Sequence, residues 1–367
     1  MAHKGKSMRT DIYYWKCDCP GSLEQKQASY FKEKYDRTDL ADTVRRACRA
    51  CLGSEPDDLE PLRADGNHIA FTFTHTRRKY FFRADDGAGD DDYMLAESAL
   101  MRLAVQGGVP VPEVFHTDVS RSVSPFRFQI MECRPEPCLD TYHKQGVLDL
   151  AAVGAQLGAC LRRLHAIRID GFGFIDTQLL ARTGELRGLD PTYAGYFHKR
   201  LDDHLDYLEQ HALLSGGAVE EVRRLFKRQA PRLRRSQAVL THRDMALWNV
   251  LGEPGRITAI IDWDDAVGGD PADDIGILRC FYDDDFMGPV LRGYWGAEDP
   301  GYDFECRVWL HTLRNMLWKT KLRHALGYFD KGSGFFLNIP GVRKPLREAT
   351  LERLNSALDR VRQMEVL

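Results

Sequence analysis

Hydrophobic and polar positions divide the chain into two regions, and the first predicts a small sheet with one long helix. Between about residues 40 and 132, short runs rich in aromatic residues and threonine are typical of strands. Residues 91–106 instead carry apolar side chains at helical spacing and stop at Gly107 and Gly108. The predicted strands are 69–75, 79–84, 109–114 and 126–131.

The remainder of the chain is mainly helical in its apolar periodicity, and prolines at 134–138 predict a crossover between the two regions. We expect an N-terminal extension (1–40), a small lobe (41–132) and a large lobe (133–367). The extension is polar apart from Tyr13-Tyr14-Trp15, and its pattern leaves open whether it packs on the small lobe or contributes to a dimer. The predicted helices are 148–165, 196–211, 218–230, 271–282, 304–325 and 344–364.

Polar residues interrupt the apolar pattern at one hairpin in the large lobe. His242 and Asp244 follow an apolar run, and Asn249 begins a strand that turns at 252–255 and returns as 257–261. Folding this hairpin brings Asn249 beside Asp262 at one open end. An amide oxygen and two carboxylates at a strand end suit Mg²⁺, which prefers hard oxygen ligands and keeps waters and phosphates. The hairpin therefore predicts phosphoryl transfer.

The motif His242-x-Asp244-x(4)-Asn249, followed by a strand and Asp262, resembles the catalytic core of the protein-kinase-like superfamily. Trp263 and the later Gly269-Asp270-Pro271 resemble the branch of aminoglycoside phosphotransferases and choline kinases. The resemblance implies an α+β, protein-kinase-like two-lobed fold, with a small antiparallel-sheet lobe carrying one long helix and a mainly helical large lobe.

The resemblance also implies roles for the hairpin residues. Asp244 would accept or orient the proton of the attacking hydroxyl, His242 would brace the loop, and Asn249 and Asp262 would hold Mg²⁺. Trp248 departs from the family, which usually has small or turn-forming residues before the Asn, so the substrate side of this loop is open.

On the nucleotide side, Arg83 stands where kinases present a basic residue to the α- and β-phosphates, and Glu97 is placed to pair with it. The alternative for such a pair alone is a solvated surface contact. Gly66 and Asn67 would cover the phosphates through backbone N–H groups, or form an ordinary turn. The crossover residues Glu132 and Cys133 would read the base by main-chain hydrogen bonds, which leaves ATP and GTP as equal candidates.

On the acceptor side, residues 262–303 hold twelve acidic residues against two basic ones. This excess favours a cationic acceptor. The substrate candidates are Trp248, Asp264, Asp265, Asp283 and Asp284.

Several of these charges also have structural explanations. Asp270 and Pro271 predict a helix N-terminus with Asp273 completing a capping box, and Asp274 would serve that helix or brace the catalytic loop. A run such as 283–285 is often a solvated loop. Trp248 would stack on an acceptor or plug the core beneath the loop, and His165 is expected to pack behind the site.

The amino-acid composition limits the classes of partner that the protein is expected to bind. The 367 residues are 43% hydrophobic and 29% charged, with net charge −3 and an isoelectric point near 6.5, so nothing argues for nucleic acid or an anionic membrane as partner. No apolar run is long enough to span a membrane, and no signal region follows the start. We expect a cytoplasmic protein, either a monomer or a homodimer.

Two cysteine pairs, Cys17/Cys19 and Cys48/Cys51, raise the alternative of a four-thiolate zinc site. The spacing of the first pair is shorter than usual for such ligands. The second pair lies at helical spacing within 43–52, which is the pattern of an apolar helix stripe, and we favour this interpretation.

The leading hypothesis is an ATP- or GTP-dependent phosphotransferase that acts on a hydroxyl of a small molecule, with an aminoglycoside-like or other antibiotic preferred for resistance or self-protection. A metabolic acceptor of the choline, homoserine or sugar type is the alternative, and Trp248 with Trp263 would supply part of an aromatic cage for choline. A pseudokinase that binds nucleotide as a scaffold is the third hypothesis, supported by the unusual loop before Asn249 and opposed by the complete set of catalytic residues.

Overall fold

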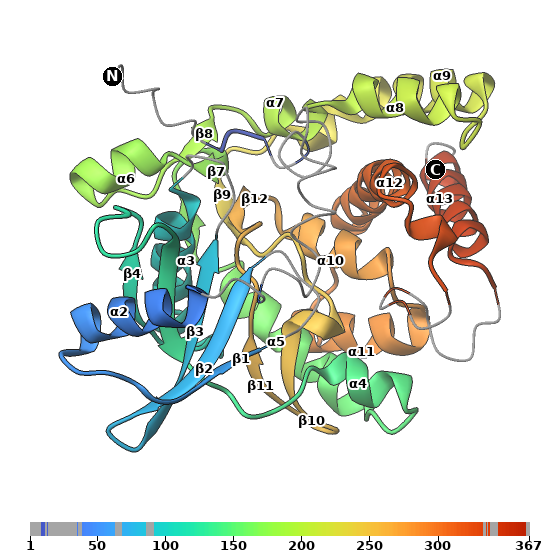
Figure 1. The fold of residues 1–367 in the computed structure, drawn as a ribbon. Coiled ribbons are helices and arrows are strands. Elements are labelled where there is room, and N and C mark those ends of the chain that lie inside the picture. The colour runs from blue at the N-terminus through green and yellow to red at the C-terminus, as the bar shows by residue number, and fades with distance from the viewer. Residues whose placement is uncertain are drawn as a thin grey trace.

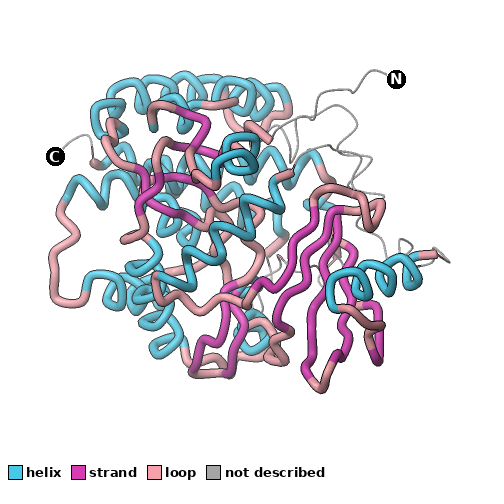
Figure 2. Tube along the Cα trace, turned by 90° about the vertical axis from the view of Figure 1, so that its left-hand side faces the viewer, coloured by secondary structure: helices cyan, strands magenta, loops and turns pink. Residues whose placement is uncertain are grey.

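The computed structural model describes residues 9–11, 13, 35, 39–62, 68–85, 92–332, 335, 337 and 344–364. They form a small lobe built on an antiparallel sheet and a larger, mainly helical lobe (Figures 1 and 2). The two-lobed α+β arrangement expected from the sequence is confirmed.

The small lobe is one five-stranded sheet in the order β1-β2-β3-β5-β4, with every neighbouring pair antiparallel. Alternate residues of its second strand (Ile69, Phe71 and Phe73) are buried with Cys48 of helix α2 (Leu40–Leu52) in one hydrophobic cluster. This places Cys48 on an apolar stripe, as favoured above. The strands are β1 (Asp57–Pro61), β2 (Ile69–His75), β3 (Arg78–Asp85), β4 (Val114–Asp118) and β5 (Arg127–Glu132).

The predicted strand 109–114 is wrong, because β4 begins only at Val114. Pro110 and Pro112 have no N–H to give to a sheet ladder. The stretch instead contacts the large lobe, where the N–H of Ile260 donates to the carbonyl of Pro110 at 2.8 Å. The long helix of the small lobe, α3 (Tyr93–Gln106), lies where the pattern predicted it.

The large lobe surrounds a hairpin and a second five-stranded sheet, in the order β6-β9-β12-β7-β8, with helices (Figure 1). The hairpin pairs β10 (Val250–Glu253) with β11 (Arg256–Ile260). The sheet strands are β6 (Arg168–Ile169), β7 (Phe172–Ile175), β8 (Gly188–Asp190), β9 (Ala238–Thr241) and β12 (Val267–Gly269). The α-helices are α4 (Leu139–Lys144), α5 (Leu150–Leu164), α6 (Thr177–Thr183), α7 (Tyr193–His198), α8 (Leu201–Gln210), α9 (Gly216–Gln229), α10 (Pro271–Arg279), α11 (Asp284–Trp295), α12 (Tyr302–Ala325) and α13 (Leu346–Gln363).

Two helix predictions need correction. The segment predicted as one helix at 196–211 is two, α7 and α8, because Arg200 adopts a left-handed conformation (φ 57°) between them. Helix α11 has no counterpart among the predictions, since the acidic run 283–285 was interpreted as a loop or a ligand site. This helix packs unusually close to α5: a Cβ on Gly158 would lie 2.0 Å from the carbonyl oxygen of Val290.

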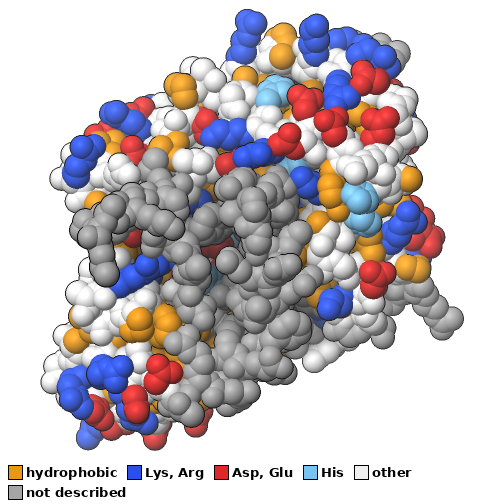
Figure 3. Space-filling model, turned by 45° about the horizontal axis from the view of Figure 1, so that its top comes forward, with side chains coloured by type: hydrophobic (Ala, Val, Ile, Leu, Met, Phe, Trp, Pro, Cys, Tyr) orange, Lys and Arg blue, Asp and Glu red, His pale blue; other side chains and the backbone are white. Residues whose placement is uncertain are grey.

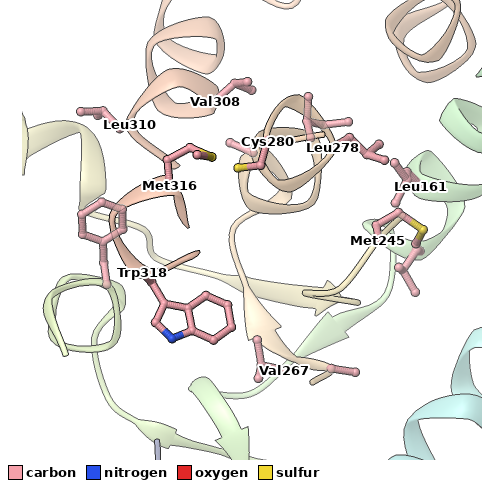
Figure 4. Packing of buried hydrophobic residues seen from close by; sticks show 14 of the residues in the cluster. Leu161, Met245, Val267, Leu278, Cys280, Val308, Leu310, Met316 and Trp318 are labelled. Carbon is pink, nitrogen blue, oxygen red and sulfur yellow. The ribbon is translucent and has the colours of Figure 1, made fainter. Parts of the chain in front are cut away.

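The main hydrophobic cluster runs through the large lobe and includes the loop that carries Asp244. Met245, the next residue, is fully buried in this cluster together with Leu161 of α5, and Figure 4 draws the two near each other. In the same view Cys280 and Met316 join α10 to α12. The loop that carries Asp244 is therefore held in place by apolar packing.

The outer surface of the large lobe carries interspersed charges (Figure 3). Arg223 of α9, for example, lies 2.5 Å from Asp206 and 3.1 Å from Asp202 of α8. Within the described part of the chain, no helix is both long and apolar enough to cross a membrane.

Candidate active site

The hairpin β10–β11 brings Asn249 and Asp262 to the same end, as its pattern predicted. Val250 is paired with Ile260, and the N–H of Ile261 donates to the carbonyl of Asn249 at 2.9 Å. Asp262 follows with a left-handed backbone (φ 64°), which is uncommon for a non-glycine residue and turns the chain away from the strand.

The side chains of Asp244 and Asn249 are hydrogen-bonded to each other. The Asn249 amide nitrogen donates to the Asp244 carbonyl at 2.8 Å and to its Oδ2 atom at 3.1 Å. Both partners only accept, so the nitrogen must face Asp244. The amide oxygen of Asn249 is then directed elsewhere, as a metal ligand would be.

His242 braces this loop through both ring nitrogens. Its Nε2 atom lies 3.0 Å from the carbonyl oxygen of Ile261 and must donate, while Nδ1 accepts from the N–H of Asp244 at 3.3 Å. Burial lowers the pKa of His242 despite the opposing effect of nearby carboxylates. The neutral ring thus ties the loop before Asp244 to the strand before Asp262.

Asp274 on α10 holds the same loop from behind. Its carboxylate accepts the backbone N–H groups of His242 at 2.9 Å and Arg243 at 2.8 Å, and lies 3.1 Å from Nε2 of His165. Burial would raise the pKa of Asp274, but the hydrogen bond from His165 lowers it below its ordinary value. His165 in turn lies 2.9 Å from the Tyr294 hydroxyl. Two expectations are confirmed: Asp274 braces the loop, and His165 packs behind the site.

Arg83 and Glu97 form a buried ion pair with 2.6 Å between the guanidinium and the carboxylate. Another nitrogen of Arg83 lies 3.8 Å from Asp262, so the arginine links α3 to the hairpin end. Burial alone would lower the pKa of Arg83, but the carboxylates of Glu97 and Asp262 raise it. The Nε atom of Arg83 is buried without a hydrogen-bond partner in the described structure. A buried cation with an unused donor suits an incoming phosphate.

Three possible metal-ligand atoms lie close together beside Arg83. Atoms of His68, Asp262 and Asp264 all lie within 4.8 Å of one another. His68 belongs to the end of the loop before β2, so the small lobe contributes to the same point. The sequence interpretation missed His68 because a single histidine beside a turn carries no signal of its own.

The remaining nucleotide-side residues are placed less directly. Gly66 and Asn67 lie outside the described residues. Glu132 ends β5, and its N–H donates to the carbonyl of Glu113 at 2.8 Å, while its carboxylate lies 3.0 Å from Arg134. The N–H of Glu132 is therefore not available to a nucleotide base. The main chain of the half-buried Cys133 remains as the candidate for that contact.

The two tryptophans of the motif have different environments. Trp263 is fully buried, stands edge-on to His242 and donates its indole N–H to the carbonyl of Ile260 at 2.9 Å. It therefore cannot supply the part of an aromatic cage for choline that the alternative hypothesis gave it. Trp248 is partly exposed and meets Phe281 edge to face, with 4.7 Å between ring centroids.

The acidic residues expected to recognise the acceptor are dispersed. Asp283 and Asp284 lie at the N-terminal end of α11, 83% and 86% exposed, and each is paired with an arginine: Arg353 at 2.9 Å and Arg279 at 3.1 Å. Asp265 is buried. The structure thus places only Asp264 beside the predicted metal end of the hairpin.

Two further aspartates of this region are buried in ion pairs. Asp270 caps α10 through the N–H of Ala272 at 3.0 Å, as predicted, and pairs with Arg307. Asp273 contacts Arg243 at 2.5 Å and Asn315 at 2.9 Å, which is different from the predicted capping box. Its partners come from distant elements, so local spacing could not reveal them.

The N-terminal segment was not expected at this site. The guanidinium of Arg9 donates to the carbonyl of Asp264 at 3.0 Å, and the Tyr13 hydroxyl lies 3.5 Å from Arg243. Both side chains are buried. No motif in residues 9–13 marks them, because their partners are about 230 or more positions away.

Comparison with known families settles the class of this protein. The model of the phosphotransferase enzyme family matches residues 58–306, well over half of the chain. The chain belongs to the phosphotransferase enzyme family. A sequence comparison with curated proteins gives no match.

Solved structures similar to this phosphotransferase share its fold. Aminoglycoside phosphotransferase APH(4)-Ia is 20% identical with a TM-score of 0.62, covering 87% of this chain and 98% of its own. A choline/ethanolamine kinase family protein from Mesorhizobium loti is 19% identical with a TM-score of 0.56, covering 88% and 98%. Spectinomycin phosphotransferase APH(9)-Ia is 15% identical with a TM-score of 0.51, covering 89% and 99%. The protein-kinase-like two-lobed fold and the phosphotransferase class expected from the sequence are confirmed.

Proposed function

We propose that this phosphotransferase moves the terminal phosphoryl group of ATP or GTP to a hydroxyl of a small molecule. The observation that carries the proposal is the convergence of Asp244, Asn249, Asp262 and Arg83 at one hairpin end. Solved relatives bound to ADP or AMP-PNP support a nucleotide donor.

Asp244 orients the acceptor in this mechanism. Its partly exposed carboxylate is held at one oxygen by Asn249. The other oxygen accepts the hydrogen bond of the acceptor hydroxyl and takes its proton as the new P–O bond forms. The bond between the γ-phosphorus and the bridging oxygen breaks at the same time and releases the nucleoside diphosphate. Such chemistry depends on positioning and charge neutralisation more than on covalent catalysis.

The donor phosphates are held by the hairpin end and by Arg83. Asn249 and Asp262 offer the hard oxygen ligands that would hold Mg²⁺, and such an ion neutralises phosphate charge when bound. Arg83, kept in place by Glu97, binds the α- and β-phosphates from the small lobe. The main chain of Cys133, at the crossover between the lobes, contacts the base.

For the acceptor we propose an aminocyclitol-type antibiotic as the first candidate. Relatives of the same fold are described as complexes with hygromycin B and with spectinomycin. Trp248 supports an acceptor with a ring face to stack upon. Asp264 is the acidic candidate beside the hairpin end, whereas Asp283 and Asp284 lie at the N-terminal end of α11. The choline alternative is weakened by the burial of Trp263.

The test is a panel of hydroxyl acceptors incubated with the protein, Mg²⁺ and either ATP or GTP, with mass spectrometry to detect the gain of one phosphoryl group. An aminocyclitol that gains this mass, with matching release of nucleoside diphosphate, supports the proposal. The Asp244→Asn protein is the matched control. Nucleotide binding without acceptor-dependent release from any member of the panel favours the scaffold hypothesis.

A further inference from the structure

The N-terminal segment 9–11 is anchored to the large lobe by two basic residues at the junction of α7 and α8. Lys199 donates to the carbonyl of Thr10 at 3.0 Å, and Arg200 donates to the carboxylate of Asp11 at 3.0 Å. Lys199 also lies 2.7 Å from Asp190, so its ammonium group is itself fixed. The segment therefore has a defined place beside the site.

Arg9 reaches from this anchor to the small lobe. It is 8% exposed, and its guanidinium lies 5.0 Å from the ring centroid of Tyr93 and 5.7 Å from that of Phe174. Tyr93 begins α3, the helix that carries Glu97, and its hydroxyl donates to the carbonyl of Ala266. Arg9 thus fills the space between α3 and residues 264–266.

Through this position Arg9 acts on the chain just after Asp262. Its hydrogen bond holds the carbonyl of Asp264, and its charge lies 3.8 Å from the Asp264 carboxylate. Asp262 has a left-handed backbone, which costs free energy and persists only when neighbouring contacts enforce it. The contacts of Arg9 and Tyr93 with residues 264 and 266 are of this kind.

Tyr13 makes the corresponding contact before Asp244. It is 2% exposed, its ring lies 4.2 Å from the guanidinium of Arg314, and its hydroxyl accepts from Arg243 at 3.5 Å. Arg243 directly precedes Asp244 and is also left-handed (φ 67°). Asp273 pairs with the same arginine, so Tyr13 and Asp273 both hold the Arg243 side chain in place.

We infer that residues 9–11 and Tyr13 form an interlobe strap that positions both functional carboxylates, with Arg9 acting through Asp264 on Asp262 and Tyr13 acting through Arg243 on Asp244. The inference rests on the proposed function for the roles of the two carboxylates. Arg9 and Tyr13 are positioning residues, since neither touches the reacting groups directly. The strap couples the angle of α3, and so the Arg83–Glu97 pair, to the catalytic loop.

The test compares full-length Arg9→Met, Arg9→Lys and Tyr13→Phe with wild type. Methionine keeps an apolar stem but loses the hydrogen bond to Asp264, lysine keeps the charge, and phenylalanine keeps the Tyr13 ring. Arg362→Met is the matched control, because Arg362 on α13 is a partly exposed arginine paired with Glu221 and Asp359. We expect kcat of Arg9→Met to fall by about 10- to 100-fold while KM for the nucleotide stays within about twofold. Lysine should restore part of kcat, and Tyr13→Phe should lower kcat by a few fold.

Hydrogen exchange supplies a readout that does not need the acceptor. Backbone amides of 243–245 and 262–266 should exchange faster in Arg9→Met than in wild type, at an unchanged melting temperature, and should not change in Arg362→Met. Unaltered exchange and unaltered kcat in Arg9→Met overturn the strap. So does a lower melting temperature with equal losses in kcat and in nucleotide affinity that lysine does not restore, because that is the pattern of general destabilisation.

The two proposals fail separately. If wild type transfers no phosphoryl group to any acceptor, the proposed function fails, while the exchange experiment still decides whether the segment orders the two loops. If Arg9→Met does not fold, Arg9→Lys and Tyr13→Phe decide: local amide exchange and kcat identical to wild type in both overturn the strap.

Discussion

The side-chain amide of Asn249 donates to the carboxylate of Asp244, with 3.1 Å between the nitrogen and Oδ2. This single contact fixes the orientation of both groups. The amide nitrogen is used by the carboxylate, so the amide oxygen is the atom available to a metal ion. One carboxylate oxygen is used by the amide, so the other is available to a hydroxyl.

Asp244→Asn should lower kcat by about 100- to 10,000-fold, the usual contribution of a positioned general base. The substituted amide oxygen still accepts from Asn249, so the loop should keep its shape and nucleotide affinity should change little. Steady-state kinetics together with binding of a fluorescent ATP analogue measures both quantities. Retention of full activity contradicts the assignment of Asp244.

Asp262→Asn should abolish turnover that depends on Mg²⁺ and weaken binding of the metal–nucleotide complex. The reason is that the change removes a charged oxygen ligand while keeping the side-chain volume. Titration of the protein and ATP with Mn²⁺, followed by electron paramagnetic resonance, measures metal binding without catalysis. Asp285→Asn is the control, since this exposed aspartate belongs to the same acidic region and lies on the first turn of α11. Unchanged Mn²⁺ affinity in Asp262→Asn rules out the metal role.

Arg83→Met should both destabilise the fold and raise KM for the nucleotide. It leaves Glu97 buried without its cation, which typically costs about 3–5 kcal/mol. The double variant Arg83→Met/Glu97→Met should recover much of the free energy of unfolding, because no unpaired charge remains, but should not recover nucleotide affinity. Denaturant unfolding and nucleotide binding separate the two effects. Recovery of affinity in the double variant shows that the pair is only structural.

Stability should fall on acidification partly because His242 is buried neutral. Its folded pKa is below the unfolded value of roughly 6.5, so the unfolded state binds more protons as pH falls below that value. The contribution of His242 is therefore complete above roughly pH 6.5 and is lost as pH falls towards its folded pKa. The difference in unfolding free energy between wild type and His242→Gln, measured from pH 7.5 to 5, should shrink with acidification. A constant difference contradicts a neutral buried ring.

Trp248→Ala should raise KM for the acceptor by about tenfold and leave nucleotide affinity unchanged, as expected for loss of one stacking face. Trp248→Phe should retain part of the affinity. Phe281→Leu is a useful companion, because Phe281 supports the indole edge to face at 4.7 Å. An acceptor KM that does not respond to either change places the acceptor elsewhere.

Much of the catalytic hairpin could be predicted because its information is local. Strand, turn and returning strand are adjacent in the chain, so their pattern places Asn249 beside Asp262 without knowledge of any other element. The pairing of Arg83 with Glu97 was predicted from the resemblance to kinases, because a strand and the following helix carry such a pair there; the spacing alone also allows a solvated surface contact. The strand at 109–114 failed because its prolines cannot donate to a ladder.

The acidic region illustrates the opposite case. Counting charges between 262 and 303 suggested an acidic pocket for a cationic acceptor, but the count cannot say which carboxylates are already neutralised. Asp273 pairs with Arg243 of an earlier loop, and Asp283 pairs with Arg353 of the final helix. The first carboxylate is buried and the second is exposed. Ion pairs between residues so far apart in the chain depend on how the helices pack, and a local sequence pattern does not predict that packing.

The sequence by itself determined the phosphotransferase class, because the spacing of His242, Asp244, Asn249 and Asp262 resembles that of kinases. It also determined that Asn249 lies beside Asp262, because the two strands of the hairpin are adjacent in the chain. Tertiary structure alone decided which groups surround that hairpin. It buried Trp263, tied Asp283 and Asp284 to arginines, and brought Arg9 and Tyr13 against the segments that carry Asp262 and Asp244. The physical reason is that such contacts join segments separated by up to about 255 positions. Their existence follows from the packing of the two lobes and the extension, and not from the propensities of the residues that make them.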